Sequence, residues 1–307
     1  MSEALPLRYR PKTFDEFVGN ESSINAIKSM IERDLEDIPS SWLITGDSGC
    51  GKTTIARILK NELQCNDLCF SEYNSSNTRG IDTIRKVQEY SRMAPMVGES
   101  KVFLFDECHM LTKEAQNAML KMLEDSPKNT FYILATTNPE KLIKPIHSRC
   151  VKVAVTPLSS KLLLPYLRDI SDEEGVDISS DILSMICKAS GGVPRDAVKM
   201  LDAVLDLEDE VNMKAVITSS ILDEVGIFDF CKLLLDEKTK WKEISDSIRT
   251  LTQDPETIRR SIIGILSGFL LNDGSTRTAA VLECFMENYF DSGKAGLVYS
   301  CFATRHL

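Results

Sequence analysis

The chain has 307 residues, of which 43% are hydrophobic and 27% charged. This composition is typical of a folded protein of about two or three domains and excludes a disordered chain. No apolar run approaches the roughly 18 residues of a membrane span, and the N-terminal segment MSEALPLRYRPK lacks the apolar core of a secretory signal. The nine cysteines are scattered, which predicts free thiols in a reducing compartment.

The net charge of −10 is unevenly distributed along the chain. Residues 1–160 and residues 226–307 each carry a net charge of −1, whereas residues 161–225 carry −8. Because electrostatic steering depends on the local field, the acidic total does not exclude a basic stripe for nucleic acid in the first segment.

Apolar runs alternate with helical patterns in the first half of the chain. The runs predict buried strands of a parallel sheet at Trp42–Thr45, Lys101–Asp106 and Thr130–Thr137. Apolar spacing of 3.6 residues predicts crossover helices at Lys52–Leu63, Ile81–Met93 and Lys113–Glu124. This alternation indicates an α/β domain with helices on both faces of the sheet.

Strand signals stop after about Val155, and only helical patterns follow. A small helical group is predicted at Ser159–Gly175, Ser180–Ser190 and Pro194–Leu205. A second group is predicted at Ile227–Asp236, Lys240–Leu251, Pro255–Leu271, Arg277–Phe290 and Gly293–Ala303. We therefore predict an α/β domain at 1–157, a helical lid at 158–223 and an all-α C-terminal domain at 224–307.

The segment directly after the first predicted strand matches the P-loop pattern G-x-x-x-x-G-K-[ST] and opens a helix. It consists of Gly46, Asp47, Ser48, Gly49, Cys50, Gly51, Lys52 and Thr53. Glycines let backbone N–H groups face phosphates, and the helix N-terminus adds its positive dipole end. Lys52 would neutralise the β- and γ-phosphates, and the Thr53 hydroxyl would bind Mg²⁺. The alternative is a chance glycine-rich loop.

The second predicted strand delivers Asp106 and Glu107 at its C-terminal end, where parallel sheets bind ligands. Asp106 would hold Mg²⁺, and Glu107 would act as general base on the attacking water. A solvated acidic strand end is the alternative. Cys108 and His109 follow, but no further ligands lie at zinc spacing, so we expect a hydrogen-bonded or surface histidine.

The third predicted strand ends in a polar residue that could contact the γ-phosphate or the water. Asn138 is the first candidate and Thr137 the second. An ordinary Asn-Pro turn after a strand is the alternative.

These motifs together resemble the AAA+ ATPases, and among them the clamp-loader subunits of DNA polymerases. The resemblance is closest in DECHML at 106–111, in AQNAMLKMLE at 115–124, in LATTNP at 134–139 and in IHSRC at 146–150. RYRPK at 8–12, followed by FDEFVG at 14–19, is similar to the adenine-side segment of the family. NSSNTRGID at 74–82 is similar to replication factor C small subunits. Bacterial gamma/tau subunits carry a four-cysteine zinc module, whereas only Cys65 and Cys69 occupy that stretch here. We therefore expect no zinc, and the mixed pattern suggests a phage or another divergent source.

The resemblance implies roles for further residues. Arg149 would complete the ATP site of a neighbouring subunit in trans, and Arg195 would reach the γ-phosphate from the lid; a local ion pair and a surface arginine are the respective alternatives. Tyr9, Arg10 and Val18 would border the adenine, although Tyr9 and Val18 could be packing residues. Thr54 and Pro194 complete the implied ATP-binding set.

The resemblance also implies DNA, clamp and subunit partners. Phosphate-contacting cations are expected at Arg79, Arg85, Lys86, Arg92 and Lys113; an ordinary solvated face is the alternative. The implied protein is an ATPase subunit that opens a sliding clamp and places it on primer-template DNA. It would act in a homo- or hetero-oligomer, implied to be a pentamer, joined through the C-terminal helices. It would lie in the cytoplasm of a bacterium or phage-infected cell, or in a eukaryotic nucleus, without a membrane partner. Another AAA+ machine, such as a helicase loader or branch-migration motor, and a non-hydrolysing structural subunit stay open.

Overall fold

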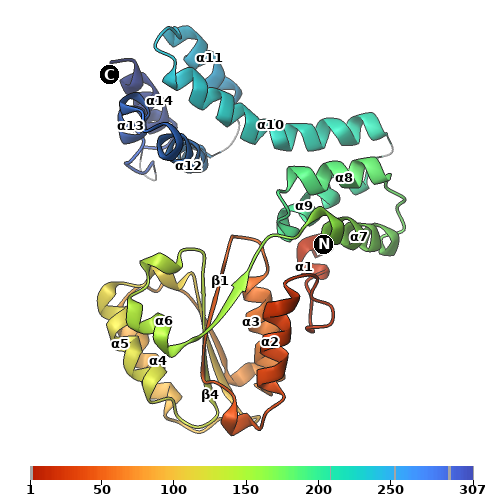
Figure 1. Cartoon of the computed structure of the whole chain (residues 1–307), viewed down its shortest axis with the longest axis vertical. Helices are drawn as coiled ribbons and strands as arrows, with labels where there is room; N and C mark the ends of the chain where they lie inside the picture. Colours follow the sequence, from red (N-terminus) through yellow and green to blue (C-terminus); the bar gives the residue numbers. More distant parts are fainter. Residues whose placement is uncertain (1–2, 208, 252–253, 290–291, 307) are drawn as a thin grey trace. The chain divides into compact units, whose positions relative to one another are not determined.

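The structure is a computed structural model that describes residues 3–207, 209–251, 254–289 and 292–306. The chain forms two compact units, Met1–Glu208 and Asp209–Leu307, here called the first and second unit (Figure 1). The first unit contains a parallel sheet and a group of three helices, and the second unit is helical throughout its described residues.

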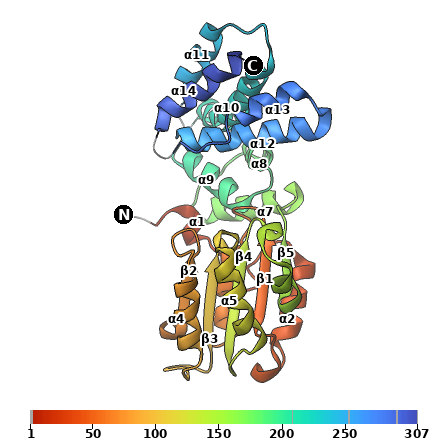
Figure 2. The ribbon, with the colours of Figure 1, turned by 90° about the vertical axis from the view of Figure 1, so that its left-hand side faces the viewer.

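The sheet of the first unit has five parallel strands in the order β2-β3-β4-β1-β5 (Figure 2). Their bounds are β1 (Ser41–Gly46), β2 (Phe70–Asn74), β3 (Lys101–Asp106), β4 (Thr130–Thr136) and β5 (Val151–Val155). Parallel pairing places the C-terminal ends of all five strands at one edge, where the first unit can form a ligand site.

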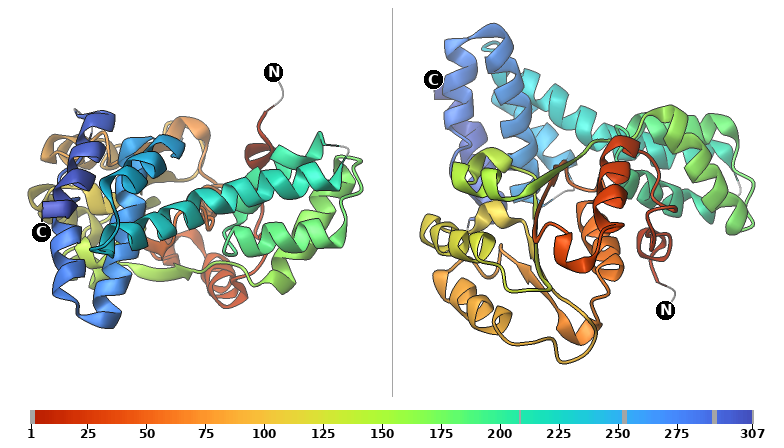
Figure 3. Two further views of the ribbon diagram at one scale, coloured as in Figure 1. Left: turned by 90° about the horizontal axis from the view of Figure 1, so that it is seen from above. Right: turned by 60° about the horizontal axis from the view of Figure 1, so that its bottom comes forward.

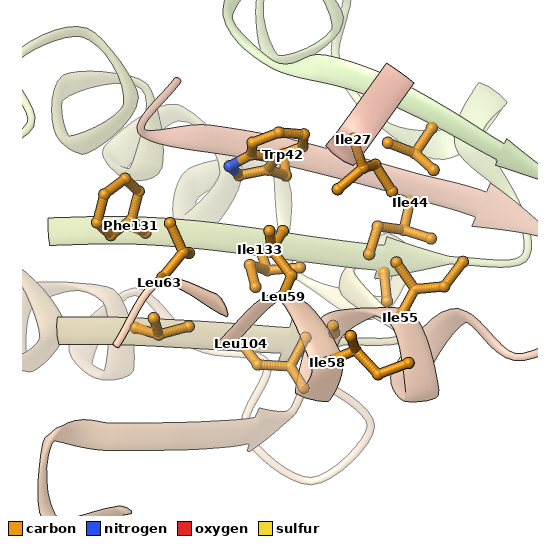
Figure 4. Packing of buried hydrophobic residues seen from close by; sticks show 14 of the residues in the cluster. Ile27, Trp42, Ile44, Ile55, Ile58, Leu59, Leu63, Leu104, Phe131 and Ile133 are labelled. Atoms are coloured by element: carbon orange, nitrogen blue, oxygen red, sulfur yellow. The ribbon is translucent and has the colours of Figure 1, made fainter. Parts of the chain in front are cut away.

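The central strands are buried on both faces because helices cover each side. Successive side chains alternate between two cores: Trp42 and Ile44 of β1 face one, and Leu43 faces the other. The first core packs the strands against α2 (Glu21–Ile31) and α3 (Lys52–Glu62), and Figure 4 shows Ile55, Ile58 and Leu59 of α3 against β1, β3 and β4. The second core packs them against α4 (Ile81–Ser91), α5 (Lys113–Glu124) and α6 (Lys144–Arg149).

Three helices complete the first unit and are called the lid: α7 (Ser160–Glu173), α8 (Ser180–Ala189) and α9 (Pro194–Leu205). They pack on one another through fully buried side chains, among them Leu163, Ile186 and Leu201. The short N-terminal helix α1 (Leu5–Arg8) packs against α9. Residues 5–10, here called the N-terminal arm, therefore pack together with the lid.

The second unit is a bundle of five helices in its described residues. They are α10 (Glu210–Leu235), α11 (Trp241–Thr250), α12 (Pro255–Asp273), α13 (Thr276–Glu283) and α14 (Gly293–Ala303). α12 and α13 run side by side (Figure 3), and α12 supplies the central apolar residues Ile258, Ile262 and Leu266. Within the described residues, no helix is both long and apolar enough to cross a membrane.

The α/β fold class and most predicted helices are confirmed. The helices at 113–124, 194–205 and 293–303 agree residue for residue. No range was predicted for the strands β2 and β5 or for the helices α1, α2 and α6. β2 and β5 are the edge strands of the sheet and only partly buried, so their sequences do not show the continuous apolar runs used to identify the central strands.

Two predicted helix boundaries are wrong. The helix predicted at 277–290 is α13, which ends at Glu283, and Phe290 lies outside the described residues. The predicted helix at 227–236 is the last part of α10, which extends without a break from Glu210. The proposed lid boundary between 223 and 224 therefore falls inside α10, and the two compact units divide at Glu208 and Asp209. The three-domain division stays a prediction.

Candidate functional site

The P-loop connects β1 to α3 and is held open by glycines in conformations that other residues avoid. Gly49 has a φ of 79°, and a Cβ there would lie 2.6 Å from Cγ1 of Val193 at the start of the lid helix α9. Gly46 has a φ of 149°, and a Cβ there would lie 2.1 Å from the carbonyl oxygen of Val155. The predicted glycines therefore give both the loop curvature and a close approach of the lid.

Lys52 begins α3 and its side chain lies inside the loop. Nζ donates hydrogen bonds of 2.9 Å to the carbonyl oxygens of Gly46 and Asp47. Burial lowers the pKa of Lys52, while the carboxylates of Glu107 and Asp106 act in the opposite direction. Lys52 is thus a buried cation within electrostatic range of both acidic residues. Its role toward the phosphates stays a prediction.

Thr53 and Asp106 meet across the site although they are 53 positions apart. The Thr53 hydroxyl donates a 2.9 Å hydrogen bond to Oδ2 of Asp106, whose Oδ1 accepts from the backbone N–H of Glu107 at 2.9 Å. These two oxygen donors fit Mg²⁺, which prefers hard oxygen ligands and takes its remaining positions from phosphates and water. Thr53 and Asp106 are therefore the residues that would hold the ion.

Glu107 lies immediately after β3 and before the short helix η3 (Cys108–Met110). Its φ of 50° and ψ of 42° place it in the left-handed region, which is uncommon for a residue with a side chain and is often found at functional sites. Its Oε2 lies 3.3 Å from the hydroxyl of Thr137 and 3.3 Å from Nδ1 of His109. Polar groups from two segments thus surround one carboxylate oxygen.

Of the two sensor candidates, Thr137 rather than Asn138 lies against Glu107. The amide Nδ2 of Asn138 donates to Glu140 at 3.1 Å, and its Oδ1 accepts from the Thr137 hydroxyl at 3.0 Å. Asn138 therefore contacts Glu107 only indirectly, through Thr137. The geometry favours the second candidate, and the sensor role of either residue stays a prediction.

A pocket beside the P-loop contains every residue predicted to border the adenine. Tyr9, Arg10 and Val18 line it together with the P-loop residues Gly49, Cys50, Gly51 and Thr54 and the lid residues Pro194 and Arg195. Burial, followed by the nearby cations Arg57 and Arg195, lowers the pKa of Arg10. This clustering of positive charge in a cavity that also has aromatic and aliphatic lining residues suits a nucleotide, whose base is flat and whose phosphates are anionic.

The same pocket contains residues that the sequence analysis missed. Phe17, Leu158, Tyr166 and Val198 also line it. Tyr166 and Val198 belong to the lid helices, where apolar periodicity indicates burial without saying what the side chains face. Phe17 lies one position before Val18, within the segment that resembles the adenine side of the family, but no role was predicted for it.

Glu174 joins the N-terminal arm to the lid. It follows α7 and accepts a 2.5 Å hydrogen bond from the Tyr9 hydroxyl and a 2.8 Å salt bridge from Arg8. The Tyr166 hydroxyl donates to the carbonyl oxygen of Tyr9 at 3.2 Å. The hydrogen bond to Glu174 and burial raise the pKa of Tyr9 to about 12, so the phenol stays protonated at neutral pH.

Arg195 and Arg149, the two arginines with roles implied by the family resemblance, have different surroundings. The backbone N–H of Arg195 lies 3.4 Å from the carbonyl oxygen of Gly49, which brings the start of α9 onto the P-loop. Arg149 ends α6, where its Nε donates to Oε1 of Glu124 at 2.7 Å and its Nη1 donates to the carbonyl of Pro145 at 2.9 Å. The local ion pair that was the alternative for Arg149 is therefore present in this chain.

The five predicted DNA contacts are all exposed and lie at or between α4 and α5. Arg85 is 64% exposed and pairs with Asp82 across one helical turn at 3.4 Å, an interaction that contributes little at a surface. Arg79 donates from Nε to the carbonyl of Ser76 at 2.9 Å. Lys86, Arg92 and Lys113 are the other three. DNA binding stays a prediction.

The cysteines offer no metal-binding group within the described ranges. No set of three or more His, Cys, Asp or Glu side chains gathers there to hold an ion. Cys65 and Cys69 are buried, and each thiol contacts a backbone carbonyl. The absence of zinc stays a prediction.

The comparisons with known proteins agree with this geometry. A family model described as DNA polymerase III, delta subunit, matches residues 66–159. The chain is 35% identical to the replication factor C small subunit of Methanococcus maripaludis over 214 residues, which are 68% of this chain and 67% of that protein. The chain belongs to the clamp-loader subunit family of AAA+ proteins.

Bacterial members of this family are also similar. Identity is 29% over 261 residues to the DNA polymerase III subunit gamma of Buchnera aphidicola, covering 78% of this chain and 71% of that one. It is 32% over 225 residues to subunit gamma/tau of Mycobacterium bovis, covering 66% of this chain but only 39% of that protein. The chain thus spans less than half the length of the Mycobacterium protein.

Solved structures confirm the fold alone. The RuvB Holliday junction branch migration motor of Thermotoga maritima matches with a TM-score of 0.60 and 22% identity over 83% of this chain and 85% of that one. A DNA polymerase III gamma subunit-related protein from the same organism matches with a TM-score of 0.50 and 18% identity over 92% and 98%. The suggestion of a phage source stays a prediction.

Proposed function

We propose that this chain binds and hydrolyses ATP with Mg²⁺ as the ATPase subunit of a sliding-clamp loader. The observation that carries the proposal is the 2.9 Å contact between Thr53 and Asp106, beside the buried Nζ of Lys52 and the carboxylate of Glu107. The P-loop and the acidic strand end are thereby joined into one site, with all four chemical groups that phosphoryl transfer requires.

Each residue has a distinct role in this reaction. Lys52 and the loop N–H groups bind the β- and γ-phosphates, and Arg195 approaches them from the lid. Thr53 and Asp106 hold Mg²⁺, which when bound neutralises charge that develops on the phosphates. Glu107 accepts a proton from water as the water oxygen attacks the γ-phosphorus, and the bond to the β–γ bridging oxygen breaks. Inorganic phosphate and ADP are the products.

Arg149 acts on the site of a neighbouring subunit. In this chain Arg149 is 29% exposed and paired with Glu124, so the interaction with a neighbour's γ-phosphate replaces an exposed ion pair of small energetic weight. A guanidinium supplied in trans stabilises the charge of the transition state. ATP binding therefore biases the arrangement of adjacent subunits, and loss of the γ-phosphate releases it.

The proposed partners are the clamp, primer-template DNA and other loader subunits in a pentamer. The last turn of α4 and the segment between α4 and β3 expose four large apolar side chains, at Tyr90, Met93, Met96 and Val97, and we assign the clamp to this surface. Arg79, Arg85, Lys86, Arg92 and Lys113 contact the DNA backbone without reading bases. The helices of the second unit join the subunits.

Steady-state ATP hydrolysis tests this function. Turnover by the assembled protein is measured alone, with a sliding clamp, with primed DNA and with both. Stimulation by clamp and DNA together is expected, because each favours the arrangement of subunits that completes the site. Turnover that responds to DNA but is indifferent to every clamp would contradict the clamp-loader function and favour another AAA+ motor.

Arg149→Ala tests the assignment in trans. Turnover by the assembly should fall by about 10³-fold or more, whereas ATP affinity measured on dilute monomer should be unchanged. Glu124→Ala is the matched control, since it removes the local hydrogen-bond acceptor of Arg149 and leaves the arginine available. Loss of ATP affinity by monomeric Arg149→Ala would show that Arg149 acts within its own chain.

A further inference from the structure

His109 connects the ends of two neighbouring strands through one ring nitrogen. Nδ1 lies 3.0 Å from the hydroxyl oxygen of Thr136, the last residue of β4, and 3.3 Å from Oε2 of Glu107, the residue after β3. The imidazole is 9% exposed, whereas the Glu107 side chain is 32% exposed. A buried imidazole thus contacts Oε2 of a carboxylate that is itself partly exposed to solvent.

The hydrogen on this ring is assigned to Nδ1. Burial lowers the pKa of His109, so the imidazole is neutral at neutral pH and carries a single N–H. The Thr136 hydroxyl oxygen already accepts from the backbone N–H of Asn138 at 3.0 Å. An anionic oxygen 3.3 Å from Nδ1 favours a hydrogen there over a lone pair, because two lone pairs facing each other repel.

Glu107 needs contacts from neighbouring residues because its own backbone conformation is unfavourable. The left-handed conformation costs free energy for a residue with a side chain, and η3 begins directly after it. The hydroxyl of Thr137, the residue after β4, contacts the same oxygen Oε2 at 3.3 Å. The second oxygen, Oε1, has no hydrogen-bond or ion-pair partner recorded among the described residues.

We propose that His109 is a positioning residue for ATP hydrolysis, which holds Oε2 of Glu107 through Nδ1 so that Oε1 faces the attacking water. The inference rests on the proposed ATPase function. His109 touches neither substrate nor metal ion and takes no proton from water; it restricts the carboxylate to the orientation in which Glu107 acts as base. Its contact with Thr136 ties that orientation to the end of β4, which Thr137 directly follows.

The test compares three replacements in the full-length assembled protein. Asparagine places an N–H donor close to the position of Nδ1, glutamine places one near Nε2 instead, and leucine supplies none. His109→Asn should keep kcat within about 3-fold of the unmodified protein, whereas His109→Gln and His109→Leu should lower it by about 10- to 100-fold. The ATP dissociation constant, measured by titration calorimetry, should change less than 2-fold in all three variants.

A second measurement separates positioning from a general structural effect. Single-turnover hydrolysis is compared for Glu107→Gln alone and combined with His109→Leu. If His109 acts through the carboxylate, the second substitution adds less than a 2-fold loss in this background. His306→Leu, which changes an exposed histidine of the second unit, is the control for the single substitution.

The outcomes divide clearly. Equal losses with asparagine, glutamine and leucine, or a full further loss in the Glu107→Gln background, would overturn the positioning role. If His109→Leu fails to fold in a thermal unfolding experiment, the contrast between asparagine and glutamine decides alone. Absence of turnover in the unmodified assembly would instead overturn the proposed ATPase function, and the inference with it.

Discussion

The two units of this chain bury their polar groups for different purposes. In the first unit, buried and half-buried polar side chains converge on one edge of the sheet, where Lys52, Thr53, Asp106 and Glu107 leave hydrogen-bonding capacity directed into an accessible site. In the second unit, Glu256 and Arg259 satisfy each other through two hydrogen bonds of 2.6 and 2.8 Å, and Nη1 of Arg259 donates to the carbonyl of Phe285 at 2.9 Å.

This difference separates charged groups that bind a ligand from charged groups that stabilise the fold. A charged group that is fully paired inside a bundle has nothing left for a ligand, and its removal should affect folding. A charged group held at a sheet edge by backbone carbonyls, as Lys52 is, can exchange those partners for phosphates. Substitutions in the first unit should therefore change binding or turnover without unfolding the protein, and the reverse should hold for Glu256.

The largest expected effect in the first unit is that of Glu107→Gln. The amide keeps the shape of the side chain but cannot accept a proton from water, so kcat should fall by about 10²- to 10⁴-fold. ATP affinity should stay within about 3-fold, since Glu107 does not bind the phosphates. Quenched-flow hydrolysis and calorimetry measure the two quantities, with Glu62→Gln, an exposed position at the end of α3, as control. Unimpaired turnover would refute the base assignment.

Lys52→Ala tests whether a buried charge of the first unit serves ATP binding rather than stability. Removing the buried cation leaves the loop itself with only neutral N–H donors for the phosphates, and ATP affinity should fall about 100-fold or more. Thermal unfolding should show no large loss of stability, because the buried ammonium carries a desolvation cost that its removal relieves. Lys188→Ala, at an exposed position of the lid, should leave affinity unchanged. Strong destabilisation by Lys52→Ala would break the contrast between the units.

The sequence predicts those parts of the site that lie in one motif or at the ends of neighbouring strands, but not contacts that depend on how distant segments pack. The P-loop is contiguous, and Asp106 could be placed beside Thr53 because the ends of parallel strands meet at one edge. Glu174 could not be placed beside Tyr9, since the two are 165 positions apart and the contact depends on how the lid packs. The contact of His109 with Thr136 likewise requires the register of β4 beside β3.

The fold shows the same limit. The central strands β1, β3 and β4 were predicted because helices cover both of their faces, which demands continuous apolar runs. The edge strands β2 and β5 carry polar residues, and pairing with a neighbour rather than local sequence makes them strands. In the second unit, α10 continues without a break from Glu210 to Leu235, whereas periodicity located only its end and not its beginning.

The Glu256 network gives the matching prediction for the second unit. Hydrogen bonds from Arg259, despite burial, lower the pKa of Glu256 from 4.5 to about 2. A carboxyl whose pKa is lower in the folded state stabilises that state above its unfolded pKa and loses this contribution as the pH falls through its folded pKa. The second unit should therefore lose about 2–3 kcal/mol of stability between about pH 5 and pH 2 from this group.

The two tryptophans allow each unit to be followed separately. Trp42 is buried in the sheet of the first unit, and Trp241 packs edge-on against Phe302 in the second. Fluorescence-detected denaturant unfolding of a Trp42→Phe background reports the second unit alone. Glu256→Gln should lower its stability near neutral pH and flatten the acid dependence. An unchanged pH profile in this variant would mean that other carboxyls set the acid response.

The smallest expected effect comes from the contact between the N-terminal arm and the lid. Tyr9→Phe keeps the ring in the base pocket and removes only the hydroxyl that donates to Glu174, while Arg8 keeps its 2.8 Å salt bridge to the same residue. Loss of one partly buried hydrogen bond should lower the population of the closed pocket and weaken ATP binding by about 2- to 10-fold. Calorimetry near neutral pH measures this, with Tyr299→Phe in the second unit, where Tyr299 is exposed, as the matched control. Equal affinity for Tyr9→Phe and the unmodified protein would mean that Arg8 alone suffices to hold the arm. An effect of Tyr299→Phe of the same size would mean that the two units are coupled in nucleotide binding. The functional separation between the units would then no longer hold.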